Sequence, residues 1–138
     1  MQRLQKILLV EDDFVDVMTV KRALKDIGVD NEVVHFTNGE EAFAYLSSKE
    51  EKPCIIIMDL NTPRMSGIEF LKIVKSNMEL KKIPAVVLTT SNNEKDIVES
   101  FEYNADGYMV KPADYEEFVE TMRTIRDYWM ISKLANRR

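Results

Sequence analysis

The stretch Cys54-Ile55-Ile56-Ile57-Met58-Asp59-Leu60-Asn61 begins with an unbroken apolar run. The run extends from Cys54 to Met58, and the acidic residue Asp59 follows it directly. The apolar part is too short for a helix, and its isoleucines favour a β-strand. Apolar residues do not alternate with polar ones here, as they do in a strand that has one face in water. We therefore expect this strand to be buried on both faces, which is typical of a parallel sheet.

Four similar runs lie elsewhere in the chain, at Ile7–Val10, Val33–Phe36, Ala85–Leu88 and Tyr108–Val110. The segments between the runs carry apolar residues at helical spacing. These segments are residues 14–27, 42–46, 68–78, 97–101 and 115–129. Gly28 follows the first as a C-terminal cap, Asn38-Gly39 opens the second, and Asp114 is the N-cap of the last. The alternation predicts the α/β class, as a doubly wound (βα)5 flavodoxin-like domain with a parallel five-stranded sheet in the order 2-1-3-4-5.

The chain has 138 residues, 45% of them apolar and 31% charged, which predicts a single domain over residues 1–138 with no separate effector domain. There are 19 Lys and Arg against 24 Asp and Glu, so the net charge of −5 gives no reason to expect binding to nucleic acid or to an anionic membrane. One cysteine excludes an internal disulfide framework. No apolar run approaches the roughly 18 residues of a membrane span and no signal peptide is recognisable, so we expect a cytoplasmic protein.

Polar side chains follow four of the predicted strands. Glu11 and Asp12 follow the first strand, Asp59 the third, Thr89 the fourth and Lys111 the fifth. In open α/β sheets, ligands bind beyond the carboxyl ends of the strands, where the strand order reverses. The first and third strands flank that point in the predicted order. We therefore expect the three carboxylates to form one cluster, with Thr89 and Lys111 beside it.

Crowded carboxylates repel one another unless a cation intervenes. Mg²⁺ is the expected cation, because it is usually held by one or two carboxylates together with waters and phosphate oxygens. An ionised aspartate can attack phosphorus and form an aspartyl phosphate. Mg²⁺ and Lys111 would then neutralise the transferring group, and the Thr89 hydroxyl would donate a hydrogen bond to it. Each residue alone has a structural explanation, such as an acidic N-cap, and their coincidence at four strand ends favours a site.

These residues, in this order, resemble the receiver domain of bacterial two-component response regulators. The matching segments are Ile7 to Asp13, Ile57 to Gly67, Pro84 to Thr89 and Gly107 to Pro112. The similarity covers essentially the whole chain. Leu88-Thr89-Thr90-Ser91 and Asp127-Tyr128-Trp129 look most like the single-domain regulators paired with cyanobacterial phytochromes.

The resemblance implies that Asp59 accepts a phosphoryl group from a sensor histidine kinase, and that the protein then switches its protein–protein interactions. Four residues are implied to hold Mg²⁺: Asp12 directly, Glu11 through water, and Asp59 with the backbone carbonyl of Asn61. Thr89 and Lys111 would contact the phosphoryl group. Tyr108 would be the switch aromatic, whose rotation is coupled to movement of Thr89. Such a protein is not an enzyme beyond its own phosphotransfer and autodephosphorylation.

Other classes of protein share parts of this pattern. A phosphatase of the haloacid-dehalogenase type also uses an Asp nucleophile with Mg²⁺, but it needs a second Asp two positions later, where this chain has Asn61. A nucleotide-binding module needs a glycine-rich phosphate loop, and the four glycines lie far apart. A flavodoxin-like cofactor would need its phosphate loop where Glu11-Asp12-Asp13 stand, and these residues would repel phosphate unless a metal intervened.

A few further residues have simpler explanations. We expect His35 to be a packed or partly exposed strand residue and Cys54 to be a small core residue. Tyr128 and Trp129, late on the last helix, are either ordinary core or part of a dimer seam, so a homodimer is a hypothesis. Without an effector domain, output would pass through a downstream protein that the sequence does not name.

Overall fold

The computed structural model describes residues 4–48 and 51–135, and its elements alternate between strand and helix. The strands are β1 (Ile7–Val10), β2 (Val33–Phe36), β3 (Ile55–Met58), β4 (Ala85–Thr89) and β5 (Gly107–Val110). The helices are α1 (Phe14–Asp26), α2 (Gly39–Ser47), α3 (Gly67–Ser76), the 3₁₀ turn η1 (Leu80–Lys82), α4 (Glu94–Glu102) and α5 (Tyr115–Ala135). All strand pairs are parallel and the order is β2-β1-β3-β4-β5, which confirms the predicted topology.

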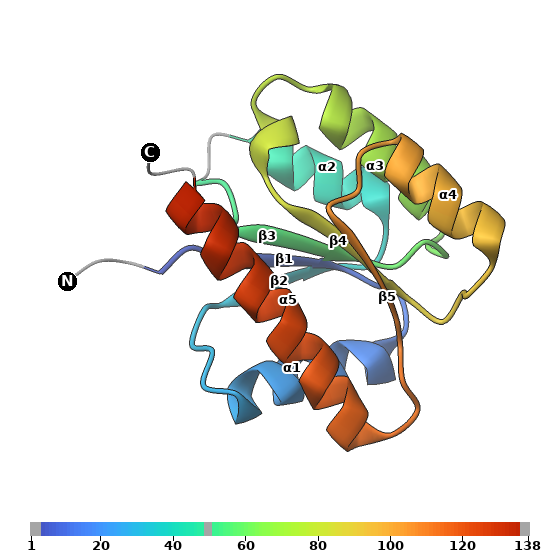
Figure 1. The fold of residues 1–138 in the computed structure, drawn as a ribbon. Helices are drawn as coiled ribbons and strands as arrows, with labels where there is room; N and C mark the ends of the chain where they lie inside the picture. The colour runs from blue at the N-terminus through green and yellow to red at the C-terminus, as the bar shows by residue number, and fades with distance from the viewer. Residues whose placement is uncertain (1–3, 49–50, 136–138) are drawn as a thin grey trace.

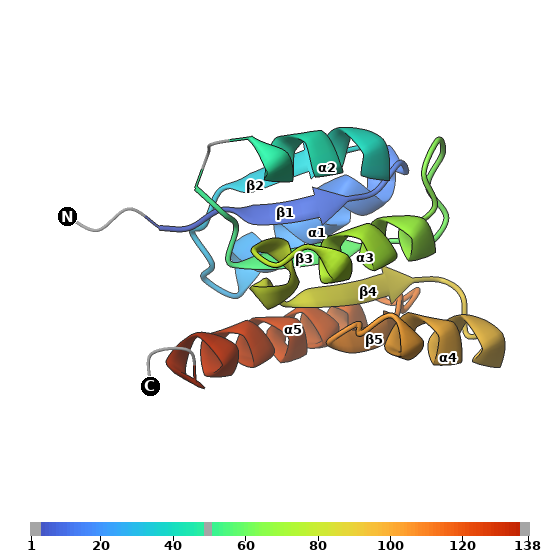
Figure 2. The same cartoon turned by 90° about the horizontal axis from the view of Figure 1, so that it is seen from above.

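The sheet is the middle of three layers. Helices α1 and α5 cover one face, and α2, α3 and α4 cover the other (Figures 1 and 2). Every residue of β1, β3 and β4 is buried, because side chains of these strands point alternately into two separate apolar clusters. The continuous apolar runs are therefore explained as predicted: both faces of each inner strand are dry.

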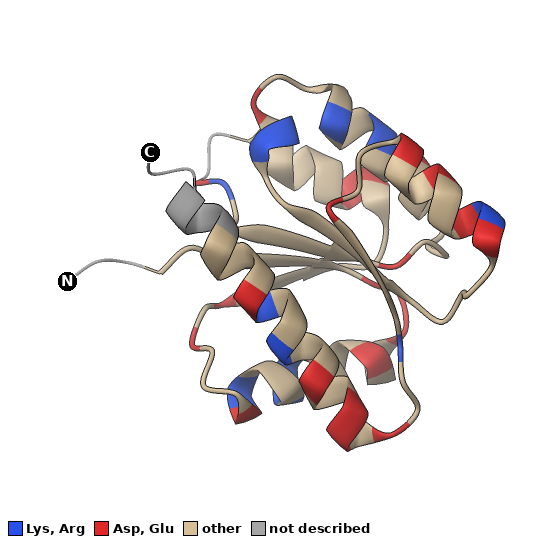
Figure 3. Ribbon diagram, viewed as in Figure 1, with Lys and Arg blue, Asp and Glu red and all other residues tan. Residues whose placement is uncertain are grey.

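Charged residues are confined to the helices and loops. None of the five strands contains Lys, Arg, Asp or Glu, and Figure 3 shows the strands in tan, with the blue and red residues on helices and loops. Within residues 4–48 and 51–135, no helix is both long enough and apolar enough to cross a membrane. The charged residues nearest to the strands in sequence therefore stand just beyond the strand ends.

The predicted caps are present. Gly28 adopts φ 80°, a left-handed conformation that suits glycine, and its amide donates to the Lys25 carbonyl at the end of α1. The Asp114 carboxylate accepts a hydrogen bond from the Glu117 amide over 3.0 Å, as an N-cap of α5 does. Asn38 caps α2 in the same way, through the Glu41 amide.

Four apolar residues within the predicted helical segments do not join the core but are exposed: Phe14, Met78, Val98 and Phe101. Met78 is 72% exposed, because α3 already ends at Ser76. The Asn77 side chain accepts hydrogen bonds from the amides of Glu79 and Leu80 and starts the turn η1 instead. Phe14 is 71% exposed, since it opens α1 at the edge of the sheet, before the helix packs against the strands.

Candidate functional site

Four polar side chains meet at the carboxyl edge of the sheet: Glu11, Asp59, Thr89 and Lys111. Backbone bonds between adjacent strands fix their positions. The Asp59 amide donates to the Val10 carbonyl, and the Lys111 amide donates to the Thr89 carbonyl over 2.7 Å. β1 and β3 are neighbours although β2 lies between them in the chain, so the cluster forms where the strand order reverses, as predicted.

The Lys111 ammonium lies at the centre of the cluster and is almost completely buried, with 6% of the side chain exposed. It donates to Glu11 Oε1 at 2.6 Å, Asp59 Oδ2 at 2.7 Å and Asp16 Oδ2 at 2.7 Å. Burial alone would lower the pKa of Lys111, but its hydrogen bonds to Asp16, Asp59 and Glu11 outweigh burial and raise it. Lys111 is therefore a permanent positive charge in the site.

Asp59 is a buried carboxylate whose two oxygens are both occupied. Oδ1 accepts from the Thr89 hydroxyl at 2.8 Å and from the Asn61 amide at 3.1 Å, and Oδ2 accepts from Lys111. Burial would raise the pKa of Asp59, but the hydrogen bonds from Lys111, Asn61 and Thr89 and the charge of Lys111 hold it below its ordinary value. Asp59 is consequently ionised at neutral pH, as a nucleophile must be.

Glu11 behaves differently, although it shares the same lysine. Burial raises the pKa of Glu11 to about 7, against the effect of the Lys111 hydrogen bond, and the negative charge of Asp59 adds to the rise. Its second oxygen, Oε2, accepts from the Asp13 amide at 3.1 Å. One site thus contains one carboxylate that is firmly ionised and one that is close to its titration point at neutral pH.

Asp12 and Asn61, the other two predicted metal ligands, lie at the exposed margin of the cluster. The Asn61 amide is tied to Asp59, which orients the β3–α3 loop. Over residues 4–48 and 51–135, no group of three or more His, Cys, Asp or Glu side chains is arranged around a common ion position. The Lys111 ammonium stands between Glu11 and Asp59 instead.

Sequence reasoning missed Asp16. It lies in the first turn of α1, where the Asp13 side chain caps its amide, and its own carboxylate reaches Lys111. An acidic residue in the first turn is common because it complements the helix dipole. The spacing therefore carried no signal that Asp16 belongs to the site.

A chain of polar contacts leads from Asp59 to β5. The Ser91 amide donates to the Thr89 hydroxyl oxygen over 3.4 Å, and the Tyr108 hydroxyl donates to the Ser91 carbonyl over 2.8 Å. Burial raises the pKa of Tyr108, which keeps its hydroxyl protonated as a donor. The ring of Tyr108 packs against the apolar cluster under α2 and α3. Thr89 is thus turned toward Asp59 while Tyr108 is held by the β4–α4 loop.

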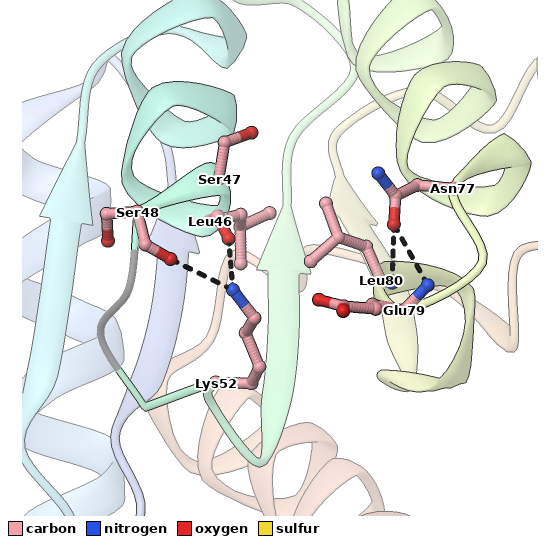
Figure 4. A pocket seen from close by; sticks show the side chains of 7 residues that line it. All are labelled: Leu46, Ser47, Ser48, Lys52, Asn77, Glu79 and Leu80. Carbon is pink, nitrogen blue, oxygen red and sulfur yellow. Dashed lines mark hydrogen bonds between the residues drawn. The ribbon is translucent and has the colours of Figure 1, made fainter.

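Apart from this site, a pocket lies at the opposite edge of the sheet, between the end of α2 and η1 (Figure 4). Its one ammonium, on Lys52, donates to the carbonyls of Leu46 and Ser48 at 2.6 and 3.2 Å and so satisfies the end of α2. Asn77 likewise binds backbone amides. The side chains of Lys52 and Asn77 in Figure 4 thus bind backbone groups.

The remaining predicted residues have ordinary positions. His35 is a half-buried strand residue whose Nε2 lies 2.7 Å from the Glu11 carbonyl oxygen. Cys54 is half-buried and directly precedes β3. Trp129 is buried in the core between α5 and the sheet, and the Tyr128 hydroxyl donates to Asp106 over 3.3 Å. Trp129 is therefore a core residue.

A (βα)5 sheet whose switch point holds an ionised aspartate, a threonine hydroxyl and a buried lysine matches the receiver-domain pattern that the sequence motifs indicated. The response regulator receiver domain family matches residues 7–123, and the chain belongs to this family. The resemblance drawn from the sequence motifs is confirmed.

The solved structures to which the chain is similar include a cyanobacterial phytochrome response regulator, as predicted. The response regulator Rcp1 of Synechocystis sp. is 36% identical over 129 residues, which cover 90% of this chain and 88% of Rcp1. The crystal structure of the phosphorylated cyanobacterial phytochrome response regulator RcpA is similar with a TM-score of 0.86 and 37% identity, over 93% of this chain and 95% of that chain. The crystal structure of the Mn²⁺-bound form of Rcp1 has a TM-score of 0.82 and 35% identity, over 91% and 94%.

Proposed function

We propose that residues 1–138 form a stand-alone response regulator that accepts a phosphoryl group on Asp59 from a sensor histidine kinase. The observation that carries the proposal is the buried, ionised Asp59 with the Lys111 ammonium at 2.7 Å and the Thr89 hydroxyl at 2.8 Å. An ionised nucleophile beside one cation and one donor is what transfer of a phosphoryl group requires.

The reaction has a simple balance. A carboxylate oxygen of Asp59 forms a bond to phosphorus while the bond from phosphorus to the donor nitrogen breaks, and the histidine leaves with the electron pair and is protonated. The carboxylate becomes an acyl phosphate, so the negative charge moves outward onto the phosphoryl oxygens. Lys111 and the Thr89 hydroxyl supply a positive charge and a donor for these oxygens.

A divalent cation fits the donor set. Glu11 and Asp59 are two buried carboxylates that already share one cation, the Lys111 ammonium, and Asp12 stands beside them at the exposed margin. Hard oxygen ligands of this kind suit Mg²⁺, which takes few protein ligands and keeps several waters. Glu11, Asp12, Asp59 and the Asn61 carbonyl would hold it. When bound, it supplies a second positive charge for the transferring group.

The Thr89–Tyr108 connection supports a switch. Phosphorylation adds charge and strong acceptors at Asp59, which favour the orientation of Thr89 toward the site. That orientation coexists in the structure with the Tyr108 hydroxyl on the Ser91 carbonyl. The population of this arrangement would rise with phosphorylation, and the surface around α4, β5 and α5 would change its preferred partner.

The partner proposed upstream is a sensor histidine kinase of the phytochrome type, because the relatives are phytochrome response regulators. Beside the site, α1 exposes the apolar side chains of Phe14, Val15 and Met18, which suit packing against a kinase helix. Downstream we propose a protein partner, with no direct contact to nucleic acid or membrane and a cytoplasmic location. A homodimer is part of the proposal, and sedimentation that finds a monomer at high concentration, with and without phosphorylation, would remove it.

Phosphate-ester turnover is not part of the proposed function. The position two residues after Asp59 is Asn61, which carries no acid to protonate a leaving group. The bound phosphoryl group would be lost by autodephosphorylation. A phosphatase assay is therefore expected to show no multiple turnover.

The test is phosphorylation by acetyl phosphate, followed by intact mass spectrometry. We expect the wild type to gain one phosphoryl group with Mg²⁺, and neither the wild type with a chelator nor Asp59→Asn with Mg²⁺ to gain it. Asp106→Asn is a suitable control, because Asp106 lies at the other edge of the sheet, where it pairs with Lys75. Equal modification of the wild type and Asp59→Asn would overturn the assignment.

A further inference from the structure

The Lys111 ammonium has three hydrogens, and each is directed to a carboxylate from a different element. Glu11 follows β1, Asp59 follows β3, and Asp16 lies in the first turn of α1. The three distances are 2.6, 2.7 and 2.7 Å, so Asp16 is bound as tightly as the two buried partners. Asp16 nevertheless differs from them, because 31% of its side chain is exposed to water.

Two of these carboxylates change during the proposed reaction, and Asp16 does not. Asp59 gives up its charge when one of its oxygens bonds to phosphorus, and Glu11 belongs to the set that would hold the divalent cation. Asp16 belongs to neither set, so neither the reaction nor the cation competes with Lys111 for its carboxylate. A flexible lysine side chain loses rotamer entropy when it is held in one position. A constant anchor removes that freedom before the phosphoryl donor arrives.

We propose that Asp16 is a positioning residue that holds the Lys111 ammonium beside Asp59 and thereby accelerates phosphorylation. The inference rests on the proposed function. Asp16 takes no part in bond making or breaking; it acts only through Lys111, as preorganisation of a charged donor does. Without the Asp16 carboxylate, the Lys111 ammonium could move away from Asp59, toward Glu11 or water, when Asp59 reacts.

Two other effects of Asp16 must be separated from positioning. As an acidic residue in the first turn it stabilises α1, and as a negative charge it repels an anionic phosphoryl donor. Asp13→Asn is the matched control. It removes one negative charge from the same turn and keeps the side-chain oxygen that caps the amides of Val15 and Asp16. The Asp13 side chain accepts hydrogen bonds at the start of α1 and does not contact Lys111.

The experiment compares initial rates of phosphorylation by acetyl phosphate with Mg²⁺ for wild type, Asp16→Asn, Asp13→Asn, Lys111→Ala and Asp16→Asn/Lys111→Ala. We expect Asp16→Asn to be about fivefold slower than wild type, the size of a partly exposed charge contact, and Asp13→Asn to change less than twofold. In the Lys111→Ala background Asp16→Asn should have no further effect, because coupled residues are not additive. A helix-stabilising role alone would give equal losses in both backgrounds.

A second measurement uses only the single variant, should Lys111→Ala not fold. Solvent exchange of the Lys111 ammonium hydrogens, followed by ¹⁵N NMR, should be faster in Asp16→Asn and unchanged in Asp13→Asn. An Asp16→Asn protein that phosphorylates as fast as wild type or faster, or whose Lys111 exchange is unaltered, overturns the inference. Failure of wild type itself to be modified at Asp59 would instead overturn the proposed function.

Discussion

The Thr89 hydroxyl donates a hydrogen bond of 2.8 Å to Asp59 Oδ1, and this bond joins the ends of β4 and β3. Thr89 is fully buried, so its hydroxyl has no contact with bulk water. A hydrogen bond to an ionised partner in such a place is strong. The bond therefore contributes to two measurable properties, the acidity of Asp59 and the stability of the fold.

Thr89→Val keeps the shape of the side chain and removes the donor. We expect the pKa of Asp59 to rise, because one of the hydrogen bonds that lower it is lost. The free energy of unfolding at neutral pH should fall by about 2 kcal/mol, the typical value of a hydrogen bond to a charged group. Carboxyl ¹³C NMR titration without divalent cations measures the pKa. Thr89→Ser keeps the donor, so an identical Asp59 titration in the two variants would contradict this explanation.

Tyr108→Phe removes the hydroxyl that binds the Ser91 carbonyl and leaves the ring. The β4–α4 loop loses an attachment to β5, so its amides around Asn92 and Asn93 should exchange with solvent about threefold faster, as expected for a bond of under 1 kcal/mol. Hydrogen exchange by mass spectrometry or NMR tests this. Tyr115→Phe is the control, because the Tyr115 hydroxyl binds Asp26 on the other side of the sheet. Equal exchange of the loop in both variants would show that Tyr108 does not restrain it.

The inner strands were predictable because burial on both faces leaves an uninterrupted apolar run, such as Ile55–Met58. The meeting of the residues at their ends was predictable for a second reason, because a parallel sheet of known strand order brings the carboxyl ends of neighbouring strands together. Glu11, Asp59, Thr89 and Lys111 meet on that principle alone. Strand order and strand ends therefore explain most of the site.

Asp16 and Met78 show where sequence patterns stop being informative. Asp16 reaches Lys111 from a helix rather than from a strand end, across 95 positions in the chain. Its contact depends on how α1 leans on the sheet, which no local pattern encodes. Met78 continues the apolar spacing of α3, but the Asn77 side chain captures two backbone amides and ends the helix. Hydrophobic periodicity does not reveal such side-chain hydrogen bonds to the backbone, which compete with the helix.

Gly67 opens α3 directly against the backbone of Asp59, the proposed phosphoacceptor. A Cβ atom at this position would lie 2.5 Å from the Asp59 carbonyl oxygen and 2.5 Å from Leu60 Cα, so the backbone of the β3–α3 loop or of α3 would have to shift. We expect Gly67→Ala to lower the free energy of unfolding by about 3 kcal/mol and to slow phosphorylation of Asp59, although alanine is the better helix former. Gly107→Ala meets only Val86 at 3.6 Å and should change the stability little. Chemical denaturation compares the two, and equal losses would refute the close-contact explanation.

Glu11 predicts how stability depends on pH. Its pKa is raised from 4.5 to about 7 in the folded protein, mainly by burial, so between these values the native state binds more protons than the unfolded state. Stability from this group is therefore fully present below pH 4.5 and is lost as pH rises through 7, by about 3 kcal/mol at most. Asp59, whose pKa is lowered, acts in the opposite sense at lower pH. Glu11→Gln cannot ionise, so urea unfolding with a chelator should show a flatter pH profile between 4.5 and 7.5 than wild type. Parallel profiles would mean that Glu11 titrates normally, and that the Lys111 contact offsets its burial.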